Sequence, residues 1–332
     1  MRAPAPFLAA DVGGTHVRVG RVQASGDRAR PVSVLDYRKY RCADFPSLSS
    51  ILEDFRSSGP AVRDCVIASA GFPLADGSVI TTNLPWPLSL PRIRQDLELA
   101  SVHLVNDFEA VAHATAYVDA SEMLQLAGPA HRPPGPMLVL GPGTGLGAAV
   151  WIPTEHGPVV LPTEAGQAAL ASNTELEMAL VRHMLRERSH VSVEHALSGP
   201  GLMNLYRALC AIRGTVPLHA APGDITAAAL AGSDPLAVES LEVFCGLLGS
   251  TVGDMALLYG IQGGIHLAGG ILPQIRDFLI GSRFVPRFLD KGPMREALER
   301  IPVKLVEHGQ LGVLGAASWF IGRTQAATPA QQ

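Results

Sequence analysis

The chain has 332 residues, of which 47% are hydrophobic and 17% charged, and its formal net charge is −4. This composition is typical of a compact globular protein long enough for two domains, and the acidic balance excludes the basic surface that nucleic-acid binding requires. No run of about 18 apolar residues predicts a transmembrane helix. From the charge and from this absence of a long apolar run, we expect neither nucleic acid nor a membrane as a partner.

The first predicted element is a hairpin close to the start of the chain. Residues 7–10 are apolar and suit a buried strand, and residues 17–20 alternate as a returning strand does. The turn between them carries Asp11, Gly13, Gly14 and Thr15. Glycines let backbone N–H groups approach phosphate oxygens, a threonine adds a hydroxyl, and a carboxylate can hold Mg²⁺ directly or through water. Taken alone, the pattern is better explained as an ordinary hairpin with a Gly-Gly turn.

The next part of the chain alternates predicted strands and helices. Strands are expected at residues 32–41, 65–71 and 79–81, and helices at residues 45–58, capped by Asp44, and at residues 90–99. A loop bounded by prolines at residues 82–87 contains Asn83, whose amide suits a polar ligand or a turn cap.

A polar pair follows the predicted strand at residues 102–105. Asn106 and Asp107 come directly after this strand and begin a helix that ends near residue 118. Ligands bind at the carboxyl ends of strands in α/β sheets, but Asn and Asp are also common helix N-caps. The residues alone leave both roles open.

A second hairpin repeats the plan of the first. An apolar strand at residues 137–140 leads into a turn with Gly141, Gly143, Thr144 and Gly145, and residues 146–151 form the returning strand. The repeat suggests two related halves that face one nucleotide. The turn does not match the dinucleotide-binding fingerprint, because that motif requires a helix after its glycines and here a strand follows. It is not a P-loop either, because no glycine-rich turn in the chain ends in Gly-Lys-Ser or Gly-Lys-Thr.

The second half of the chain is expected to be mainly helical. We expect an irregular polar loop at residues 159–167, helices at residues 174–187, 202–212, 235–259 and from residue 273, and strands at residues 264–271 and 301–306. Residues 224–226 are expected to cap a further helix, and Asp234 to begin the long one. A closely packed helix is expected at residues 311–321, with disorder from Thr324 onward.

The cysteines indicate the compartment. Cys42, Cys65, Cys210 and Cys245 are far apart and form neither a Cys-x-x-Cys pair nor a zinc pattern. The apolar stretch near the start is too short for a signal sequence. We therefore expect reduced thiols in a cytoplasmic protein.

The ordered set of motifs resembles one family over residues 8–321. The set comprises Asp11-Val12-Gly13-Gly14-Thr15, Asn106-Asp107, residues 140–147, Glu164, Glu194 with Ser198-Gly199-Pro200-Gly201, and Ala268-Gly269-Gly270. It is similar to the bacterial glucokinases that lack the zinc motif of the ROK sugar kinases, within the superfamily of hexokinase and actin. The resemblance implies an α/β fold of two actin-like (ribonuclease H-like) domains, with nucleotide and sugar in the cleft between them. The small domain would take residues 1–118 and 308–325, the large domain residues 119–307, and a disordered tail residues 326–332.

The resemblance also implies a reaction and its residues. The reaction is ATP-dependent phosphorylation of the 6-hydroxyl of glucose, with Asp107 as the base that takes the hydroxyl proton. The implied sugar ligands are Asn83, Asn106, Asp107, Glu164, Gln167 and Glu194. The implied ATP site comprises Asp11, Gly13, Gly14, Thr15, Gly141, Gly143, Thr144, Gly145, Gly269 and Gly270, with Asp11 also holding Mg²⁺. A homodimer in the cytoplasm is implied as well.

One residue departs from the family pattern. Gln167 stands where the family's Glu-Gly-Gly-His loop has its histidine; glutamine can donate and accept hydrogen bonds, but it cannot carry a positive charge. Two alternatives therefore stay open. One is a kinase for another hexose or an amino sugar, and the other is a sugar or nucleotide sensor without enzyme activity. Asp11, Asp107 and the glycine turns argue against the sensor.

Overall fold

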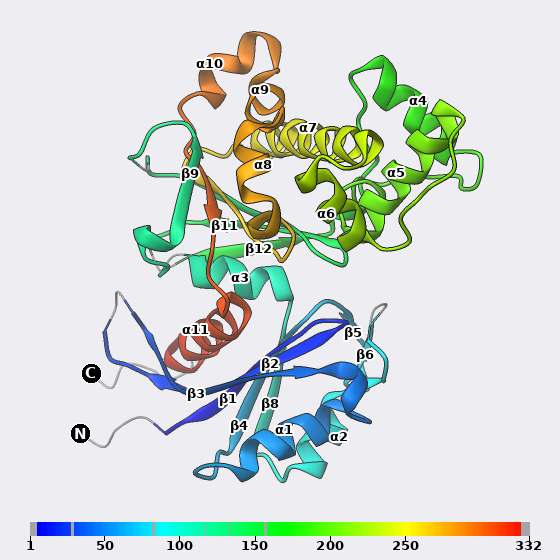
Figure 1. Cartoon of the computed structure of the whole chain (residues 1–332). Helices are drawn as coiled ribbons and strands as arrows, with labels where there is room; N and C mark the ends of the chain where they lie inside the picture. The colour runs from blue at the N-terminus through cyan, green and yellow to red at the C-terminus, as the bar shows by residue number, and fades with distance from the viewer. Residues whose placement is uncertain are drawn as a thin grey trace. The chain divides into compact units, whose positions relative to one another are not determined.

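The chain forms two compact units, one of which is discontinuous in sequence. The computed structural model describes residues 5–27, 30–81, 84–115, 117–131, 133–155 and 158–326 (Figure 1). Unit 1 comprises residues 1–119 and 308–332, and unit 2 comprises residues 120–307. Each unit has its own hydrophobic core.

Unit 1 is built on a five-stranded sheet with the strand order β3-β2-β1-β4-β8. Its strands are β1 (Phe7–Val12), β2 (His16–Ala24), β3 (Val32–Arg41), β4 (Asp64–Ser69) and β8 (Ser101–Val105). The pairs β1–β2 and β2–β3 are antiparallel, whereas β1–β4 and β4–β8 are parallel. The short strands β5 (Phe72–Pro73), β6 (Ser78–Ile80) and β7 (Leu88–Ser89) form a separate sheet.

Alternating side chains of β1 face two different cores, as the two-residue period of a strand requires. Leu8 and Ala10 belong to the core with helices α1 (Leu48–Ser57) and α2 (Leu90–Asp96). Phe7 and Ala9 belong to the core with α3 (Asp107–Thr115) and α11 (Leu311–Ala326). The sheet is therefore covered on both faces, with α11 and α1 on opposite sides of it in Figure 1.

Several expected boundaries in unit 1 are wrong. The helix expected at residues 45–58 begins at Leu48 with Ser47 as its N-cap, because Pro46 forces Phe45 into an extended conformation with φ −133° and ψ 144°. Asp44 ends a short 3₁₀ turn instead (Cys42–Asp44). At the other end of the chain, α11 continues to Ala326, so the disorder expected from Thr324 is wrong for residues 324–326. Residues 327–332 lie outside the described residues.

Unit 2 contains a six-stranded sheet with the order β12-β11-β10-β13-β14-β9. Its strands are β9 (Met123–Ala127), β10 (Met137–Pro142), β11 (Leu146–Ile152), β12 (Val159–Thr163), β13 (Gly264–Leu267) and β14 (Val303–Val306). The pairs β10–β11 and β11–β12 are antiparallel, whereas β10–β13 and β13–β14 are parallel. Five of its strands thus repeat the order and directions found in unit 1, as the repeated hairpin predicted.

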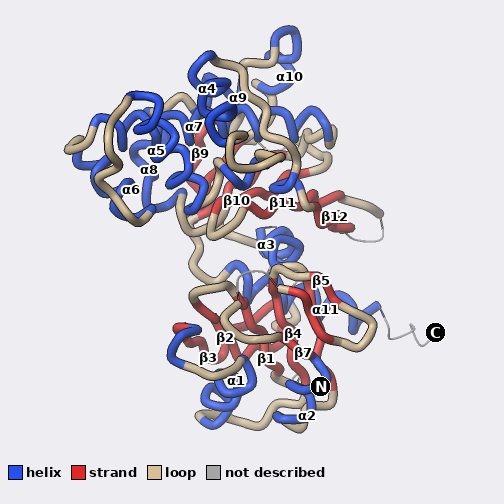
Figure 2. The backbone as a smooth tube through the Cα atoms, turned by 90° about the vertical axis from the view of Figure 1, so that its right-hand side faces the viewer, coloured by secondary structure: helices blue, strands red, loops and turns tan. Residues whose placement is uncertain are grey.

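Unit 2 carries more helices than strands, and Figure 2 shows the helices in blue around its red strands. They are α4 (Glu175–Met184), α5 (Gly199–Arg213), α6 (Pro222–Ala231), α7 (Pro235–Leu258), α8 (Arg276–Gly281), α9 (Phe284–Leu289) and α10 (Arg295–Leu298). By length and composition α7 could cross a membrane, but 78% of its apolar window is buried inside the structure. It is the central core helix of the unit.

Unit 2 also corrects some sequence expectations. Residues 159–163 form edge strand β12 rather than a loop, because β-branched residues pair with β11 and an edge tolerates Pro162. The helix expected at residue 202 already starts at Gly199, capped by Ser198. Residues 224–226 are not a cap, since α6 begins at Pro222 after Ala221. The helix expected from Pro273 is preceded by a 3₁₀ turn and starts at Arg276.

The four cysteines are free thiols, and each is buried in its unit. The expectation of reduced cysteines without a disulfide is confirmed.

Candidate functional site

Asp11, near the carboxyl end of β1, is held from two sides within unit 1. Its Oδ2 accepts a hydrogen bond from Arg18 Nη1 at 3.1 Å. Gly312 at the start of α11 packs so closely that a Cβ there would collide with the Asp11 carboxyl group. Burial raises the pKa of Asp11, and the positive charge of Arg18 opposes that rise. The Asp11 carboxylate is therefore held in a fixed position near the carboxyl end of β1.

The turn after Asp11 is tied down by backbone and thiol contacts. Gly13 N donates to the His16 carbonyl oxygen at 3.0 Å, and Cys42 N donates to the Thr15 carbonyl oxygen at 3.0 Å. The Cys42 thiol also lies 3.2 Å from the Gly13 carbonyl oxygen, which accepts its hydrogen bond. Thr15 is exposed. The turn is rigid and its threonine can meet a ligand, as an anion-binding turn requires.

Asn106 and Asp107 divide two tasks at the start of α3. Asn106 Oδ1 accepts hydrogen bonds from Phe108 N and Glu109 N, both at 3.0 Å, so Asn106 caps the helix. Asp107 is the first residue of α3, and its Oδ1 accepts from Phe108 N at 2.9 Å. The helix dipole favours negative charge in this first turn. Asn83, another predicted sugar ligand, lies outside the described residues.

Helix α3 packs on α11 through Glu109 and Ala110, a contact that the sequence motifs did not predict. Trp319 Nε1 donates to Glu109 Oε1 at 2.8 Å. A Cβ at Gly315 would collide with the carbonyl oxygen of Ala110. With Gly312 against Asp11, α11 supports both carboxylates predicted for the reaction. Its Gly- and Ala-rich composition was the one signal in the sequence.

In unit 2, the glycine turn at residues 143–145 meets two other segments. Gly143 N donates to the Gly145 carbonyl oxygen at 2.7 Å, and Gly199 N donates to the Gly143 carbonyl oxygen at 2.8 Å. Gly269 has φ +95°, and a Cβ there would lie 2.6 Å from the Pro142 carbonyl oxygen, so only glycine suits this approach. The structure thus brings the turn, the start of α5 and Gly269 together at one end of β10. Thr144 is exposed there.

Glu194 connects that turn to the sugar loop, which we define as residues 164–167. Its Oε2 accepts from Leu146 N at 2.9 Å, and its Oε1 accepts from Gln167 Nε2 at 3.3 Å. His190 Nε2 donates to the Gln167 carbonyl oxygen at 3.0 Å, a contact that sequence reasoning missed. Glu164 is exposed, and within the described part of the chain its carboxylate makes no hydrogen bond or ion pair.

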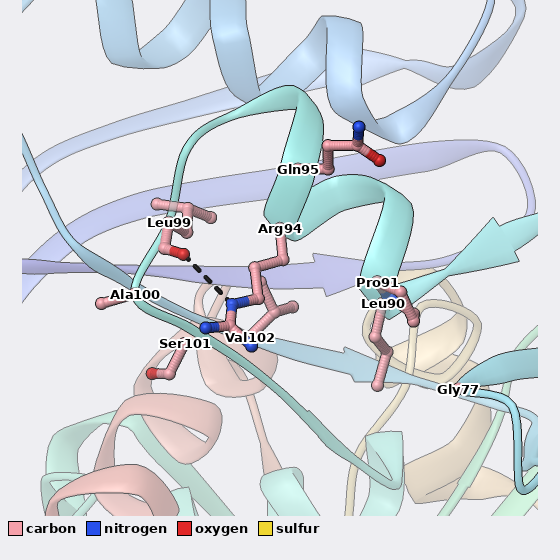
Figure 3. Close-up of a pocket in the computed structure, with 9 residues that line it drawn as sticks. All are labelled: Gly77, Leu90, Pro91, Arg94, Gln95, Leu99, Ala100, Ser101 and Val102. Carbon is pink, nitrogen blue, oxygen red and sulfur yellow. Dashed lines mark hydrogen bonds between the residues drawn. The ribbon is translucent and has the colours of Figure 1, made fainter.

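A separate cavity of about 530 Å³ lies in unit 1 between α2 and the start of β8 (Figure 3). Arg94 lines it and donates from Nε to the Leu99 carbonyl oxygen at 3.3 Å. None of the described residues predicted to bind sugar, nucleotide or metal lines this cavity. It is therefore not the candidate site.

Comparison with known proteins decides the family. The family model described as Glucokinase matches residues 8–322. The chain belongs to the glucokinase family. It is 63% identical to a glucokinase-like protein of Xylella fastidiosa over 96% of this chain and 95% of that relative. It is 36% identical to the glucokinase of Saccharophagus degradans over 95% of this chain and 98% of that relative.

A solved glucokinase structure has the same fold. The crystal structure of a glucokinase from an Antarctic psychrotroph matches with a TM-score of 0.81 and 35% identity, over 95% of this chain and 98% of that one. The expected actin-like α/β fold class is confirmed, and as a member of the glucokinase family the chain is a glucose kinase.

Proposed function

We propose that the chain transfers the terminal phosphoryl group of ATP to the 6-hydroxyl of glucose, with Asp107 as the general base. Membership of the glucokinase family supports the reaction. The assignment of the base rests on one observation: Asn106 caps α3 with two hydrogen bonds of 3.0 Å, so the helix does not depend on Asp107 as its N-cap. Asp107 follows the carboxyl end of β8, which is where α/β sheets place their ligands.

The transfer forms one bond and breaks one at phosphorus, and it moves one proton. The 6-hydroxyl oxygen bonds to the γ-phosphorus, the bond from that phosphorus to the β,γ-bridging oxygen breaks, and Asp107 accepts the hydroxyl proton. The products are glucose 6-phosphate and ADP. Positioning of the reactants and stabilisation of charge account for most of the rate enhancement in such a reaction. A general base contributes about 10²–10⁴-fold to the rate.

The sugar ligands have different capacities for hydrogen bonding. Asn106 uses its Oδ1 in capping, which leaves its NH₂ group as a donor to a sugar hydroxyl. Glu164 offers an exposed carboxylate, its carbonyl oxygen accepts from Gln167 N at 2.9 Å, and the Gln167 side chain is in turn bonded to Glu194. Asn83 completes the proposed set. Such groups select a sugar by its hydroxyls. A sugar that lacks one of these hydroxyls leaves the corresponding protein group without a hydrogen-bond partner and therefore binds more weakly.

The nucleotide is assigned to the glycine turns. Backbone N–H groups of Gly14, Thr15, Thr144 and Gly145 would hold the phosphates, with the Thr15 and Thr144 hydroxyls adding donors. The N–H groups of Gly13 and Gly143 instead hold their own turns in shape. Gly141 belongs to the same hairpin, and Gly269 with Gly270 gives a surface without side chains against which adenosine can lie.

Asp11 fits a magnesium ion that arrives with ATP. The described residues contain no group of three or more His, Cys, Asp or Glu able to hold a metal by themselves. Magnesium in phosphoryl-transfer enzymes is typically held by one or two carboxylates together with substrate phosphates, and Asp11 is such a carboxylate at the end of β1. When bound, the ion would neutralise phosphate charge, while Arg18 keeps the Asp11 carboxylate in place.

The test of the base is Asp107→Asn in a coupled assay of ADP formation. We expect at least a 100-fold loss of kcat, with the dissociation constant for glucose changed by less than about fivefold, because the amide keeps the shape but cannot accept the proton. Asp277→Asn, which changes a first-turn carboxylate in α8, is the matched control and should keep wild-type kinetics. Wild-type turnover in Asp107→Asn would refute the assignment.

The same assay with a panel of sugars tests the substrate. Glucose is expected to have the highest kcat/KM. Preference for another hexose or an amino sugar would replace glucose as the substrate. Sugar binding without any phosphorylation would favour the sensor.

A further inference from the structure

We propose that Glu194 is a positioning residue for the nucleotide as well as a sugar ligand, because its carboxylate holds the glycine turn of unit 2 and the sugar loop together. This inference rests on the proposed function. It predicts that changing Glu194 weakens nucleotide binding even when no sugar is present.

The two carboxylate oxygens bind two different segments. Oε2 accepts from Leu146 N at 2.9 Å, and Leu146 is the first residue after the glycine turn. Oε1 accepts from Gln167 Nε2 at 3.3 Å, at the end of the sugar loop. Hydrogen bonds to an ionised acceptor are stronger than neutral ones. The Glu194 side chain therefore joins the glycine turn, which is assigned to the nucleotide, to the sugar loop, which is assigned to the sugar.

Two glycines make this contact possible. A Cβ at Gly145 would collide with Glu194 Oε2, and a Cβ at Gly166 would collide with the Leu146 carbonyl oxygen. Gly145 was predicted for its closeness to phosphate, but its contact with Glu194 gives an independent reason for glycine. The sugar loop, the glycine turn and the Glu194 carboxylate form a single packed group.

The backbone of Glu194 is anchored to the same group. The Ser198 hydroxyl donates to the Glu194 carbonyl oxygen at 2.8 Å and accepts from Gly201 N at 2.9 Å, so it caps α5. The next residue, Gly199, donates to the Gly143 carbonyl oxygen at 2.8 Å. The glycine turn is thus held at one end by α5 and at the other by the Glu194 carboxylate.

The geometry implies a specific consequence for binding. Loss of the charge at Glu194 weakens the bond that fixes Leu146 N, and the turn then spends less time in the conformation that receives phosphates. The coupling between the nucleotide site and the sugar site is reciprocal. Loss of the Glu194 charge should therefore also reduce any increase in glucose affinity that bound nucleotide causes.

The experiment measures nucleotide binding directly in the full chain. The probe is a non-hydrolysable ATP analogue with Mg²⁺, titrated by calorimetry without sugar and then with saturating glucose. We expect Glu194→Gln to raise the dissociation constant of the analogue without sugar about 3- to 10-fold. Glu194→Asp, which keeps the charge but shortens the reach by one methylene, should raise it in the same direction.

The matched control is Glu164→Gln, which removes the carboxylate of the sugar loop itself. Among the described residues the Glu164 carboxylate makes no hydrogen bond to the turn, so this variant should raise KM for glucose and leave the analogue affinity unchanged. Equal analogue affinities in the wild type and in both Glu194 variants, each with a wild-type melting temperature, would overturn the inference. If Glu194→Gln does not fold, Glu194→Asp decides alone. Failure of the proposed function is a separate result, namely a wild-type chain that binds the analogue but does not phosphorylate glucose.

Discussion

His113 shows how burial of a single residue limits stability at low pH. It lies half-buried in α3, and burial lowers its pKa to about 4 from an ordinary value of 6.5. Since the folded state binds this proton less tightly than the unfolded state does, stability falls as the pH drops from about 6.5 toward 4.

The variant His113→Gln tests this effect because glutamine cannot take up the proton. From the shift to about 4, wild type should lose about 2 kcal/mol more unfolding free energy than His113→Gln between pH 7.5 and pH 5. Urea unfolding at both pH values measures the difference. His131→Gln, at an exposed position, should keep the wild-type pH dependence. Identical pH dependence in wild type and His113→Gln would show that His113 does not contribute.

Residue roles were predictable where a motif carries them and not where distant residues meet. The sequence left capping and catalysis open for Asn106 and Asp107, and the hydrogen bonds of Asn106 show that it caps. Gly145 could be explained only by its local turn, because its contact with Glu194 joins residues that no local pattern relates. The close approach of Gly312 to Asp11 is of the same kind.

Among the helices, the crossing of α3 and α11 gives the sharpest test. Gly315 lies against the Ala110 carbonyl oxygen, whereas nothing lies within 4 Å of a Cβ at Gly322 in the same helix. We expect Gly315→Ala to destabilise the protein by about 1–3 kcal/mol through overpacking. Gly322→Ala should stabilise it by about 0.5–1 kcal/mol through helix propensity.

Urea unfolding of the two variants provides the measurement, and each variant serves as the control of the other. The same substitution in the same helix should change the unfolding free energy in opposite directions. Equal stabilisation in both would mean that α3 and α11 do not pack as closely as the structure shows.

Most elements of the fold could be predicted from alternation and turn signals, and the failures have physical causes. The hairpin strands β1, β2, β10 and β11 and the start of α7 are confirmed. Strand β9 was missed because residues 123–127 are mostly helix formers that become a strand only by pairing with β14. The start of α1 moved because of a single proline.

The described residues form three hydrophobic cores, two in unit 1 and one in unit 2, and only one of them includes residues from the end of the chain. Val313, Ala316 and Phe320 of α11 pack in one core of unit 1 with Phe7 and Ala9 of β1. The core of unit 2 consists entirely of residues from within unit 2. Removal of α11 should therefore unfold unit 1 and leave unit 2 folded.

A chain that ends at residue 307 tests this expectation by hydrogen exchange. Amides of β10, β13 and α7 should keep their protection, and those of β1 and β4 should lose it. The fragment of residues 120–307, as a control, should unfold cooperatively at the temperature at which unit 2 unfolds in the shortened chain. Persistent protection of β1 without α11 would contradict the assignment of this core.

The return of the chain to unit 1 also sets an order of events during synthesis. The strands of unit 1 leave the ribosome first, but the helix that covers one face of their sheet comes only after the whole of unit 2. At ordinary elongation rates this interval lasts roughly 10–40 s. Throughout it, Phe7, Ala9 and Val66 lack the helix that buries them in the finished protein. The nascent chain therefore carries an open apolar sheet face, which is the surface that chaperones would be expected to cover.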